Sequence, residues 1–299
     1  MPELPEVECV RRSIERRVLG RRVVAVELQR TDILQPAEGM RRGSAPVAAT
    51  PRVAEGSIAG LLCGQTVTLA TRHGKRLAIV GEDGSAVGVH LGMSGRLLVF
   101  DRGTAARDEP FGGSHTHAVW QLDDGSRLAF VDHRRFGGLW DWEASDGPEA
   151  WFAGMGPDAL AIGPATLWRG LSGTRRCLKA ALLDQQVVAG LGNIYVDELL
   201  YAARLSPLTP ADRVTRDQAA GLVRRMRTLL NRAIAAGGST LRDYADADGA
   251  AGGYQLRHRA YGRGGLRCLR RGCGGSLVVD TVASRTTAWC PRCQPGGGH

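Results

Sequence analysis

The chain has 299 residues, of which 43% are hydrophobic, so it is long enough for two ordinary domains with real cores. It carries 39 basic and 30 acidic residues, a net charge of +9, and it has no run of about 18 apolar residues that would predict a membrane span. Charges begin at Glu3 and no apolar signal core follows, so we expect a cytoplasmic protein rather than a secreted one. The composition also excludes a wholly disordered chain.

Most of the positive charge lies in the last third of the chain. Residues 203–299 contain 16 Arg, 6 Asp and neither Lys nor Glu, a net charge of +10, whereas the first 202 residues sum to −1. Such a segment favours a polyanion partner, with nucleic acid the leading candidate, although a solvated Arg-rich face has the same composition. Only two lysines, Lys75 and Lys179, occur. Because Lys and Arg differ in pKa and donor geometry, both are candidate functional residues unless they persist by chance.

The first twenty residues predict a helix. Apolar residues recur at three- and four-residue spacing from Leu4 to Val18, and Gly20 stands where a helix would end. Pro5 fits the first helical turn, where its missing N–H has no consequence.

Seven short β-rich runs follow, separated by turn signals such as Asp123–Gly125. The predicted strands are Val23–Gln29, Thr66–Thr71, Arg76–Val80, Ala86–Leu91, Arg96–Phe100, His117–Leu122 and Arg127–Val131. Short strands at this spacing predict an antiparallel sandwich or barrel. Two stretches without a sustained period, Pro36–Gly56 and Asp101–Ser114, are expected to be mobile surface loops.

From about Ala159 the pattern changes to that of helices. The predicted helices are Pro164–Leu171, Leu178–Gln185, Ile194–Ala202 and Thr215–Ala236. We therefore expect an α+β multidomain protein. Its expected parts are an N-terminal helix and β-sandwich over 1–153, a linker over 154–164, a helical domain over 165–262 and a cysteine module over 263–295.

Four cysteines near the C-terminus have the spacing C-x4-C-x16-C-x2-C; they are Cys268, Cys273, Cys290 and Cys293. Thiolates paired on tight turns and joined by a hairpin-length spacer predict one tetrahedral Zn²⁺ site. In a cytosolic chain this interpretation is favoured over disulfides. The module is too short to bury a core, so we expect the metal to supply its folding free energy. Its many arginines suit a phosphate backbone, and a purely structural zinc is the alternative.

The amino terminus offers a second candidate site. If Met1 is removed, Pro2 becomes a secondary amine that attacks an aldehyde-like sugar carbon and yields an iminium, which acts as an electron sink. Glu3 and Glu6 lie within one helical turn, so both carboxylates can serve this amine as acid or base. Acids and a proline also suit any capped first turn, so the residues alone leave a purely structural role open.

These motifs together resemble those of bacterial formamidopyrimidine-DNA glycosylases. The matching segments, in the family's order, are MPELPEVE, HGKRL, HLGMSGRL, DHRRFGG, LLDQQVVAGLGNIYVDE, GGSTLRDY, AYGRGG and SRTTAWCPRCQ. The resemblance implies an N-terminal helix on a β-sandwich, then a helix-two-turn-helix DNA-binding domain and a zinc-finger hairpin. It implies a bifunctional glycosylase and AP lyase that acts as a monomer on double-stranded DNA containing oxidised purines, such as 8-oxoguanine and formamidopyrimidines, or abasic sites.

The resemblance also implies residue roles. Pro2 is the nucleophile at C1′ of the damaged nucleotide, Glu3 is a general acid and Glu6 supports the site. The implied catalytic set is completed by Lys75, for phosphate contact and proton donation, and Arg285, for δ-elimination. The implied DNA-binding residues are Met93, His115, Arg134, Phe136, Lys179, Asn193 and Tyr261. Thr240 and Tyr244 lie in the loop associated with the oxidised base.

The physics of several motifs agrees with these roles, but alternatives remain. An enzyme that extrudes a nucleotide must fill the gap, and Met93, Arg134 and Phe136 suit that task. A place in the core is the alternative for Met93 and Phe136, although the adjacent Gly and Ser residues favour an exposed loop tip. The glycines of GLGNIY permit close approach to a phosphate at a helix N-terminus, or simply form a packing elbow.

Two other functions remain possible at this point. One is an oxidised-pyrimidine glycosylase of the endonuclease VIII type, and the other is a non-catalytic zinc-finger DNA-binding protein. PELPEVE and GGSTLRDY favour the purine branch.

Overall fold

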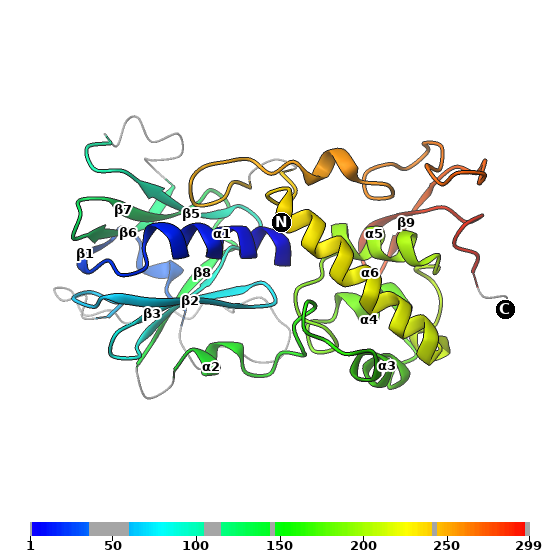
Figure 1. The fold of residues 1–299 in the computed structure, drawn as a ribbon, viewed down its shortest axis with the longest axis horizontal. Coiled ribbons are helices and arrows are strands. Elements are labelled where there is room, and N and C mark those ends of the chain that lie inside the picture. Colours follow the sequence, from blue (N-terminus) through cyan, green and yellow to red (C-terminus); the bar gives the residue numbers. More distant parts are fainter. Residues whose placement is uncertain (1, 36–59, 105–114, 144–146, 241–243, 297–299) are drawn as a thin grey trace. The chain divides into compact units, whose positions relative to one another are not determined.

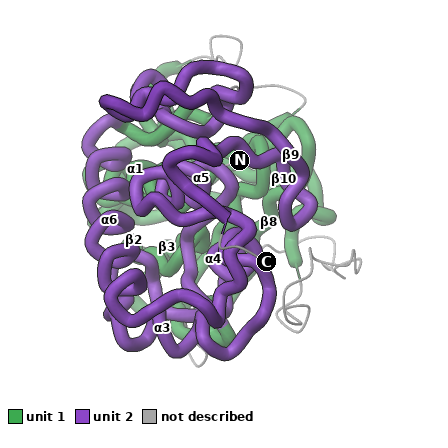
Figure 2. The backbone as a smooth tube through the Cα atoms, turned by 90° about the vertical axis from the view of Figure 1, so that its right-hand side faces the viewer, with its two compact units in different colours: residues 1–154, 237–252 green, residues 155–236, 253–299 purple. Residues whose placement is uncertain are grey.

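The computed structural model describes residues 2–35, 60–104, 115–143, 147–240 and 244–296. It divides into two compact units, shown in Figure 2: unit 1 comprises residues 1–154 and 237–252, and unit 2 comprises residues 155–236 and 253–299. The units meet in sequence at Gly154 and Met155, and residues 237–252 belong to unit 1. The expected loop Pro36–Gly56 and most of Asp101–Ser114 lie outside the described residues, as does Met1.

Helix α1 (Leu4–Arg17) opens unit 1. Glu3 caps it through a reciprocal capping box with Glu6, and Val18 ends it two residues before the predicted Gly20. Its apolar face, which includes Leu4, Val10 and Ile14, is fully buried. The helix packs against β2 (Val67–His73) and β3 (Arg76–Gly81) of one sheet and β5 (Gly95–Phe100) of another (Figure 1). The three- and four-residue spacing seen in the sequence therefore defines the packed face.

Unit 1 contains two four-stranded antiparallel sheets, with strand orders β1-β6-β7-β5 and β2-β3-β4-β8. Their bounds are β1 Val23–Leu28, β2 Val67–His73, β3 Arg76–Gly81, β4 Ala86–His90, β5 Gly95–Phe100, β6 Thr116–Leu122, β7 Arg127–Asp132 and β8 Gly138–Trp142. The seven predicted strands are confirmed to within a residue or two at each end, whereas β8 was not predicted. A short 3-10 turn, η1 (Thr31–Ile33), follows β1.

An apolar core joins the two sheets. Ile79 and Val87 of one sheet and Trp120 and Leu128 of the other line the same small cavity, together with Val18 at the end of α1. A short helix, α2 (Gly147–Phe152), was also missed from the sequence. Trp151 of α2 is buried, and its indole N–H donates to the carbonyl oxygen of Leu77 at 3.0 Å. The helix is too short for its sequence to show an amphipathic pattern, and it is stabilised instead by burial of this one large side chain.

Unit 2 is helical at its centre. Its helices are α3 (Pro164–Ser172), α4 (Leu178–Leu183), α5 (Asn193–Ala203) and α6 (Arg216–Ala235), with 3-10 turns η4 (Ala211–Arg213) and η5 (Tyr254–Arg257). The four predicted helices are confirmed, although α4 ends two residues early. Helix α6 packs against α3 and α5, and a capping box between Thr215 and Gln218 fixes its start.

The cysteine module of unit 2 contains a hairpin, β9 (Val278–Val282) and β10 (Arg285–Trp289). Ala283 and Ser284 both have positive φ, the backbone of a tight two-residue hairpin turn. The cluster that holds the module together contains three of the four cysteines and few apolar residues, among them Leu277 and Ala288. The expected fold class, a helix and β-sandwich followed by a helical region with a cysteine-rich hairpin, is confirmed.

Candidate active site and nucleic-acid interface

The first residues of unit 1 are held by the cap of α1. Pro2 is buried, and the next residue, Glu3, is only 1% exposed. The backbone N–H of Glu3 donates to Glu6 Oε2 at 2.8 Å, while the Glu3 carboxylate accepts the N–H of Glu6. Both carboxylates therefore lie at the positive end of the helix dipole, and Glu3 directly follows Pro2 in the chain.

The carboxylate of Glu6 also binds the segment 237–252. Its Oε1 accepts the backbone N–H of Ser239 at 2.7 Å. Gly238 has φ +82°, and a Cβ there would lie 2.9 Å from Glu6 Oε1, so the loop passes too close for a larger residue. Two backbone donors thus fix the Glu6 side chain, one at each oxygen. The structure assigns Glu6 a clear positioning task, because it joins α1 to a segment more than 230 residues away.

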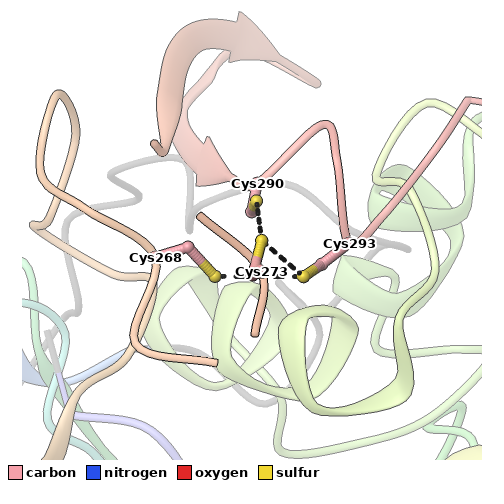
Figure 3. A group of neighbouring side chains, drawn as sticks. All are labelled: Cys268, Cys273, Cys290 and Cys293. Atoms are coloured by element: carbon pink, nitrogen blue, oxygen red, sulfur yellow. Dashed lines mark hydrogen bonds between the residues drawn. The ribbon is translucent and has the colours of Figure 1, made fainter. Parts of the chain in front are cut away.

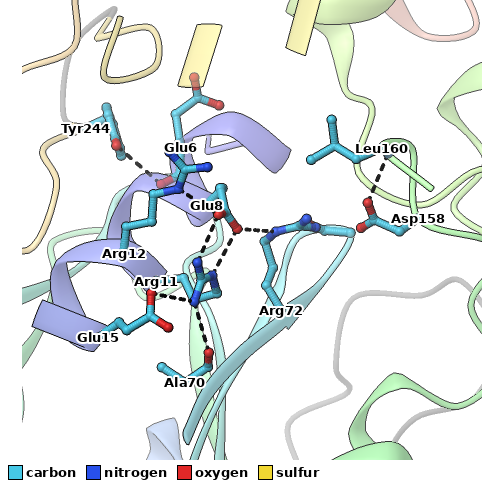
Figure 4. Close-up of polar contacts among 11 residues, drawn as sticks. Glu6, Glu8, Arg11, Arg12, Glu15, Ala70, Arg72, Asp158, Leu160 and Tyr244 are labelled. Atoms are coloured by element: carbon cyan, nitrogen blue, oxygen red, sulfur yellow. Dashed lines mark hydrogen bonds and ion pairs between the residues drawn. The ribbon is translucent and has the colours of Figure 1, made fainter. Parts of the chain in front are cut away.

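The two residues expected near the oxidised base lie in that same segment. The Tyr244 hydroxyl donates to the carbonyl oxygen of Glu6 at 3.2 Å, as Figure 4 shows, and burial raises the pKa of Tyr244, so the phenol remains a donor. Thr240 Oγ1 donates to the Tyr244 carbonyl at 3.0 Å and accepts the N–H of Gly252 at 2.8 Å. Unit 1 therefore brings Thr240 and Tyr244 to the start of α1.

A charged network fastens α1 to the hairpin that carries Lys75. Glu8 forms ion pairs with Arg11 and Arg12 of its own helix and with Arg72 of β2 at 3.2 Å (Figure 4). Burial raises the pKa of Glu8, but the arginine hydrogen bonds outweigh it and hold the pKa at about 2. Arg72 Nη1 also donates to the carbonyl of Gly74, the residue before Lys75, at 3.0 Å.

Lys75 lies in the β2–β3 turn, half-buried. On the neighbouring strand β4, burial together with the charges of Lys75 and Arg76 lowers the pKa of His90 to about 4, so this imidazole is neutral near pH 7. The predicted lysine thus occupies an electropositive edge of unit 1, where an anion would be attracted.

The three residues proposed to fill a gap in DNA lie on two adjoining loops. Met93 and Phe136 are 40% and 51% exposed, so neither is a core residue, and the Arg134 guanidinium lies 4.8 Å from the Phe136 ring centre. Gly92 has φ +57°, and a Cβ there would meet the backbone of Phe136 at 2.3 Å. The two loops are therefore in direct backbone contact.

Asp132, which is fully buried, anchors both loops. It accepts the Ser94 hydroxyl at 2.6 Å, and its second oxygen accepts the N–H of Gly137 at 2.8 Å. The sequence did not identify Asp132 or Ser94, although an acid at the start of DHRRFGG is a signal for such an anchor.

The two histidines of SHTHAVW have different surroundings. His115 is half-buried and its ring lies 4.3 Å from that of His133, whereas His117 is buried with Nε2 2.8 Å from the Asp132 carbonyl oxygen. Among the described residues, only the four cysteines form a group of three or more side chains able to hold a metal ion, and these two histidines belong to no such group.

In unit 2, the turn before α5 presents the predicted Asn193. Gly190 has φ +114°, and its N–H donates to Gln185 Oε1 at 2.9 Å. The same Gln185 side chain donates to the carbonyl of Leu191 at 3.0 Å, so it organises the whole turn, a role that the sequence did not reveal. Asn193 Nδ2 donates to the carbonyl oxygen of Thr286 in β10 at 2.9 Å.

Lys179 does not fit the direct DNA contact expected from the sequence. Its side chain is 0% exposed, and its ammonium donates to Asp197 at 2.6 Å and to the Thr287 hydroxyl at 2.7 Å. Burial raises the pKa of Asp197 to about 6, although Lys179 opposes this shift. The lysine therefore acts inside unit 2.

The two remaining predicted contact residues, Tyr261 and Arg285, have different surroundings. Glu198 of α5 accepts three backbone N–H groups, including that of Tyr261 at 2.9 Å. Arg285 is exposed and directly follows the β9–β10 turn, where a cation is free of packing constraints.

The four predicted metal ligands do come together, as Figure 3 shows. All four Sγ atoms lie within 4.8 Å of one another, and three Sγ–Sγ distances are 3.1, 3.6 and 3.9 Å. A tetrahedral zinc with bonds of about 2.3 Å needs sulfur atoms about 3.8 Å apart, so the cluster fits this metal. The C-x4-C turn of Cys268 and Cys273 is two residues longer than the C-x2-C turn of Cys290 and Cys293. Gly272 and Gly274, both with positive φ, allow the backbone around Cys273 to turn tightly. Tyr201 donates or accepts a bond with Cys268 Sγ at 3.3 Å, a contact of the kind that orients metal ligands.

Two models of one enzyme family match this chain. Residues 1–139 match the formamidopyrimidine-DNA glycosylase N-terminal domain, and residues 154–245 match the H2TH domain of the same enzymes. A formamidopyrimidine-DNA glycosylase of Cereibacter sphaeroides is 41% identical over 300 residues, covering 98% of this chain and 100% of the relative. This chain belongs to the formamidopyrimidine-DNA glycosylase family. Another relative carrying that name, from Phenylobacterium zucineum, is 39% identical over 304 residues.

Solved structures of formamidopyrimidine-DNA glycosylases have the same fold. The MutM (Fpg) protein of Thermus thermophilus is 36% identical with a TM-score of 0.80, covering 99% of this chain and all of that one. A Lactococcus lactis Fpg mutant in complex with DNA containing Fapy-dG is 28% identical with a TM-score of 0.81, covering 98% of this chain and all of that one. Family membership makes this chain a DNA glycosylase. No helix in the described part of the chain is long and apolar enough to span a bilayer.

Proposed function

We propose that this chain is a bifunctional DNA glycosylase and AP lyase that excises oxidised purines, including 8-oxoguanine and formamidopyrimidines, from double-stranded DNA. The observation that carries the proposal is the start of unit 1: Pro2 directly precedes the buried Glu3, whose backbone N–H donates to the buried Glu6, and Glu6 binds the loop of Ser239 and Thr240. In solved complexes of Lactococcus lactis Fpg, the bound DNA contains Fapy-dG or an abasic site. Since the proposed substrate is damaged DNA, we propose that the enzyme works on the DNA of the cell. All the proposed catalytic and DNA-binding residues lie on one chain, so we propose a monomer.

The chemistry begins with the secondary amine of Pro2, freed by removal of Met1. Its nitrogen forms a bond to C1′ of the damaged nucleotide, and the C1′–base bond breaks, with the base taking a proton. Glu3, next to Pro2, is the proposed general acid, which donates to the opening sugar ring so that an iminium forms. The carboxylate of Glu6 holds the cap of α1 and the loop of Ser239 in place, so it supports this step without touching the reacting atoms.

The iminium then serves as the electron sink for strand cleavage. Loss of a proton from C2′ expels the 3′-phosphate, and a second elimination expels the 5′-phosphate, leaving a one-nucleotide gap. We propose that Lys75 contacts a phosphate and supplies a proton, and that Arg285 assists the second elimination. Water finally releases Pro2 from the sugar fragment.

The proposed DNA contacts serve extrusion of the damaged nucleotide. Met93, Arg134 and Phe136 fill the gap: the exposed thioether and ring replace lost stacking, and the guanidinium bonds the orphaned base. We also propose DNA contacts for His115, Asn193 and Tyr261, and contacts with the oxidised base for the loop of Thr240 and Tyr244. We propose Zn²⁺ as the metal of the four cysteines, where it would hold the finger's fold and take no part in bond breaking.

Borohydride trapping tests the proposal. Protein whose N-terminus is shown by mass spectrometry to be Pro2 is incubated with duplexes containing 8-oxoguanine or thymine glycol, and borohydride is added. We expect a covalent adduct at residue 2 and strand cleavage, faster on 8-oxoguanine. Pro2→Gly, whose primary amine forms a neutral imine, should give weaker trapping.

The outcomes separate the candidate functions. Preferential cleavage of thymine glycol would identify an oxidised-pyrimidine enzyme of the endonuclease VIII type instead. Tight DNA binding with neither adduct nor cleavage would leave a non-catalytic DNA-binding protein and contradict the proposal.

A further inference from the structure

Lys179 is one of only two lysines in the chain, and it lies inside unit 2. It belongs to α4, and its ammonium has three protein oxygens within hydrogen-bond distance. They are Asp197 Oδ1 at 2.6 Å, Thr287 Oγ1 at 2.7 Å and the Thr286 carbonyl at 3.5 Å. An ammonium group has three donors, and these three oxygens match them in number. A cation bound in this way is unsuited to bind a phosphate at the surface.

The same contacts join the hairpin strand β10 to the helices. Asp197 of α5 uses its second carboxylate oxygen to accept the N–H of Ala288 at 3.2 Å. The Thr287 hydroxyl, which accepts from Lys179, donates to the carbonyl of Arg285 at 2.9 Å. Three consecutive residues of β10 are therefore tied to α4 and α5 through Lys179, Asp197 and Asn193.

Two proposed DNA-contacting elements meet at this network. One is the turn that ends in Asn193 at the start of α5, and the other is the hairpin turn followed by Arg285. A buried charge left without its partner is strongly unfavourable, whereas removal of both charges is tolerated far better. Loss of either Lys179 or Asp197 alone should therefore displace β10, and with it the position of Arg285 relative to Asn193.

We propose that Lys179 and Asp197 are positioning residues that fix the zinc-finger hairpin on α5, and that Lys179 promotes DNA binding without contacting a phosphate. This inference rests on the proposed DNA-binding function. It replaces the direct contact that the sequence suggested for Lys179.

The salt dependence of DNA binding distinguishes positioning from direct contact. Each phosphate neutralised by a side chain adds about 0.9 to the slope of log affinity against log salt concentration. If Lys179 touched a phosphate, Lys179→Met would lower this slope by about 0.9. A positioning role predicts weaker binding with less change in slope than loss of an exposed phosphate contact causes.

Asp197→Asn gives an independent test because the two models predict opposite effects. Removing an acid near a DNA-binding lysine would strengthen binding, or leave it unchanged, if that lysine acted by its charge. In the positioning model the substitution leaves Lys179 without its counter-ion and the Ala288 N–H without a carboxylate acceptor, so binding weakens. The double variant Lys179→Met/Asp197→Asn should bind more tightly than Lys179→Met alone, since no uncompensated charge remains.

The experiment measures binding of the zinc-loaded, full-length protein to a duplex containing an abasic-site analogue, by fluorescence anisotropy over a range of salt concentrations. Arg285→Ala serves as the matched variant for an exposed cation of the same hairpin. Hydrogen exchange at residues 278–289 reports whether the hairpin is loosened. Thr287→Val, which removes only the hydroxyl bonds, provides a milder variant should Lys179→Met fail to fold.

We expect binding about tenfold weaker or worse for Lys179→Met and for Asp197→Asn, a fall in slope for both that is smaller than that of Arg285→Ala, and faster exchange in the hairpin. Arg285→Ala should lower the slope by about 0.9. A slope lowered to the same extent by Lys179→Met, or tighter binding by Asp197→Asn, would overturn the inference and leave the proposed function intact. Failure of the wild-type protein to bind the duplex would instead overturn the proposed function.

Discussion

The carboxylate of Glu6 accepts a hydrogen bond from the backbone N–H of Ser239 at 2.7 Å. This contact joins the first turn of α1 to a loop that follows the longest helix of unit 2 in the chain. Since the other oxygen of Glu6 caps α1 at Glu3, one side chain orders both the segment beside Pro2 and the loop proposed to meet the oxidised base. Neighbouring glycines of that loop make this coupling testable.

Gly238→Ala should reduce base excision, whereas Gly237→Ala should have little effect on it. Both glycines have positive φ, so both variants share a strain of about 1 kcal/mol. Only at Gly238 would the new Cβ lie 2.9 Å from Glu6 Oε1 and displace the carboxylate from Ser239; at Gly237 the nearest atom is 3.4 Å away. We expect a single-turnover excision rate on 8-oxoguanine at least about tenfold lower for Gly238→Ala, which corresponds to loss of one charge-assisted hydrogen bond. Equal effects of the two variants would show that backbone strain alone matters.

Glu8 should make unit 1 sensitive to acid. Its pKa is held at about 2, below the ordinary value of 4.5, so its ionised form stabilises the folded state. The sign follows from this depression: the contribution is complete above about pH 4.5 and is lost as the pH falls toward 2. Glu8→Gln should therefore be less stable than wild type near pH 7, and the difference should shrink below pH 4.5.

Denaturant unfolding at several pH values measures this difference. Glu15→Gln is the matched control, because Glu15 also pairs with Arg11, at 3.1 Å, but its side chain is 48% exposed. We expect this control to lose little stability at any pH. A Glu8→Gln deficit that stays constant from pH 7 to pH 3 would contradict the assignment.

How much could be foreseen from the sequence depended on how local each feature is. The seven strands with two-residue alternation and the helices with an apolar face were predicted, because their patterns lie within one segment. The five-residue β8 and the six-residue α2 were missed. They are stabilised by partners elsewhere, as Trp151 is by Leu77.

Within the site, too, local features were predicted from the sequence and non-local ones were not. The metal cluster was predicted from cysteine spacing, and the structure brings its four sulfur atoms together. The sequence marked Lys179 as unusual but could not distinguish a phosphate contact from a buried ion pair, because its partner Asp197 lies on the next helix. Adjacent acids in an otherwise apolar helix, Asp197 and Glu198, were the available signal.

Removal of the metal should unfold the finger and leave the sandwich intact. The module's small core is built largely of cysteines, so the metal is expected to supply most of its folding free energy. Chelation or Cys290→Ala should abolish binding to lesion-containing duplex, while thermal unfolding of unit 1 stays unchanged. Zinc content by atomic absorption and binding by anisotropy measure the two effects. Unaltered incision by metal-free protein would refute the zinc assignment.

Asp132→Asn should slow excision from duplex DNA without slowing cleavage of a single-stranded abasic site. The buried carboxylate binds the Ser94 hydroxyl at one oxygen and the Gly137 N–H at the other, and an amide can accept at only one of these positions. The loops of Met93 and Phe136 should therefore loosen, and filling of the gap in the duplex should weaken. We expect excision of 8-oxoguanine from duplex DNA to slow about tenfold or more, while cleavage of a single-stranded abasic site, which leaves no gap to fill, proceeds at the wild-type rate.

Asp124→Asn is the control, since Asp124 makes comparable bonds to Ser126 in a more exposed turn away from these loops. Equal slowing on both substrates would indicate that Asp132 acts on the chemistry or the fold of unit 1 rather than on the gap-filling loops.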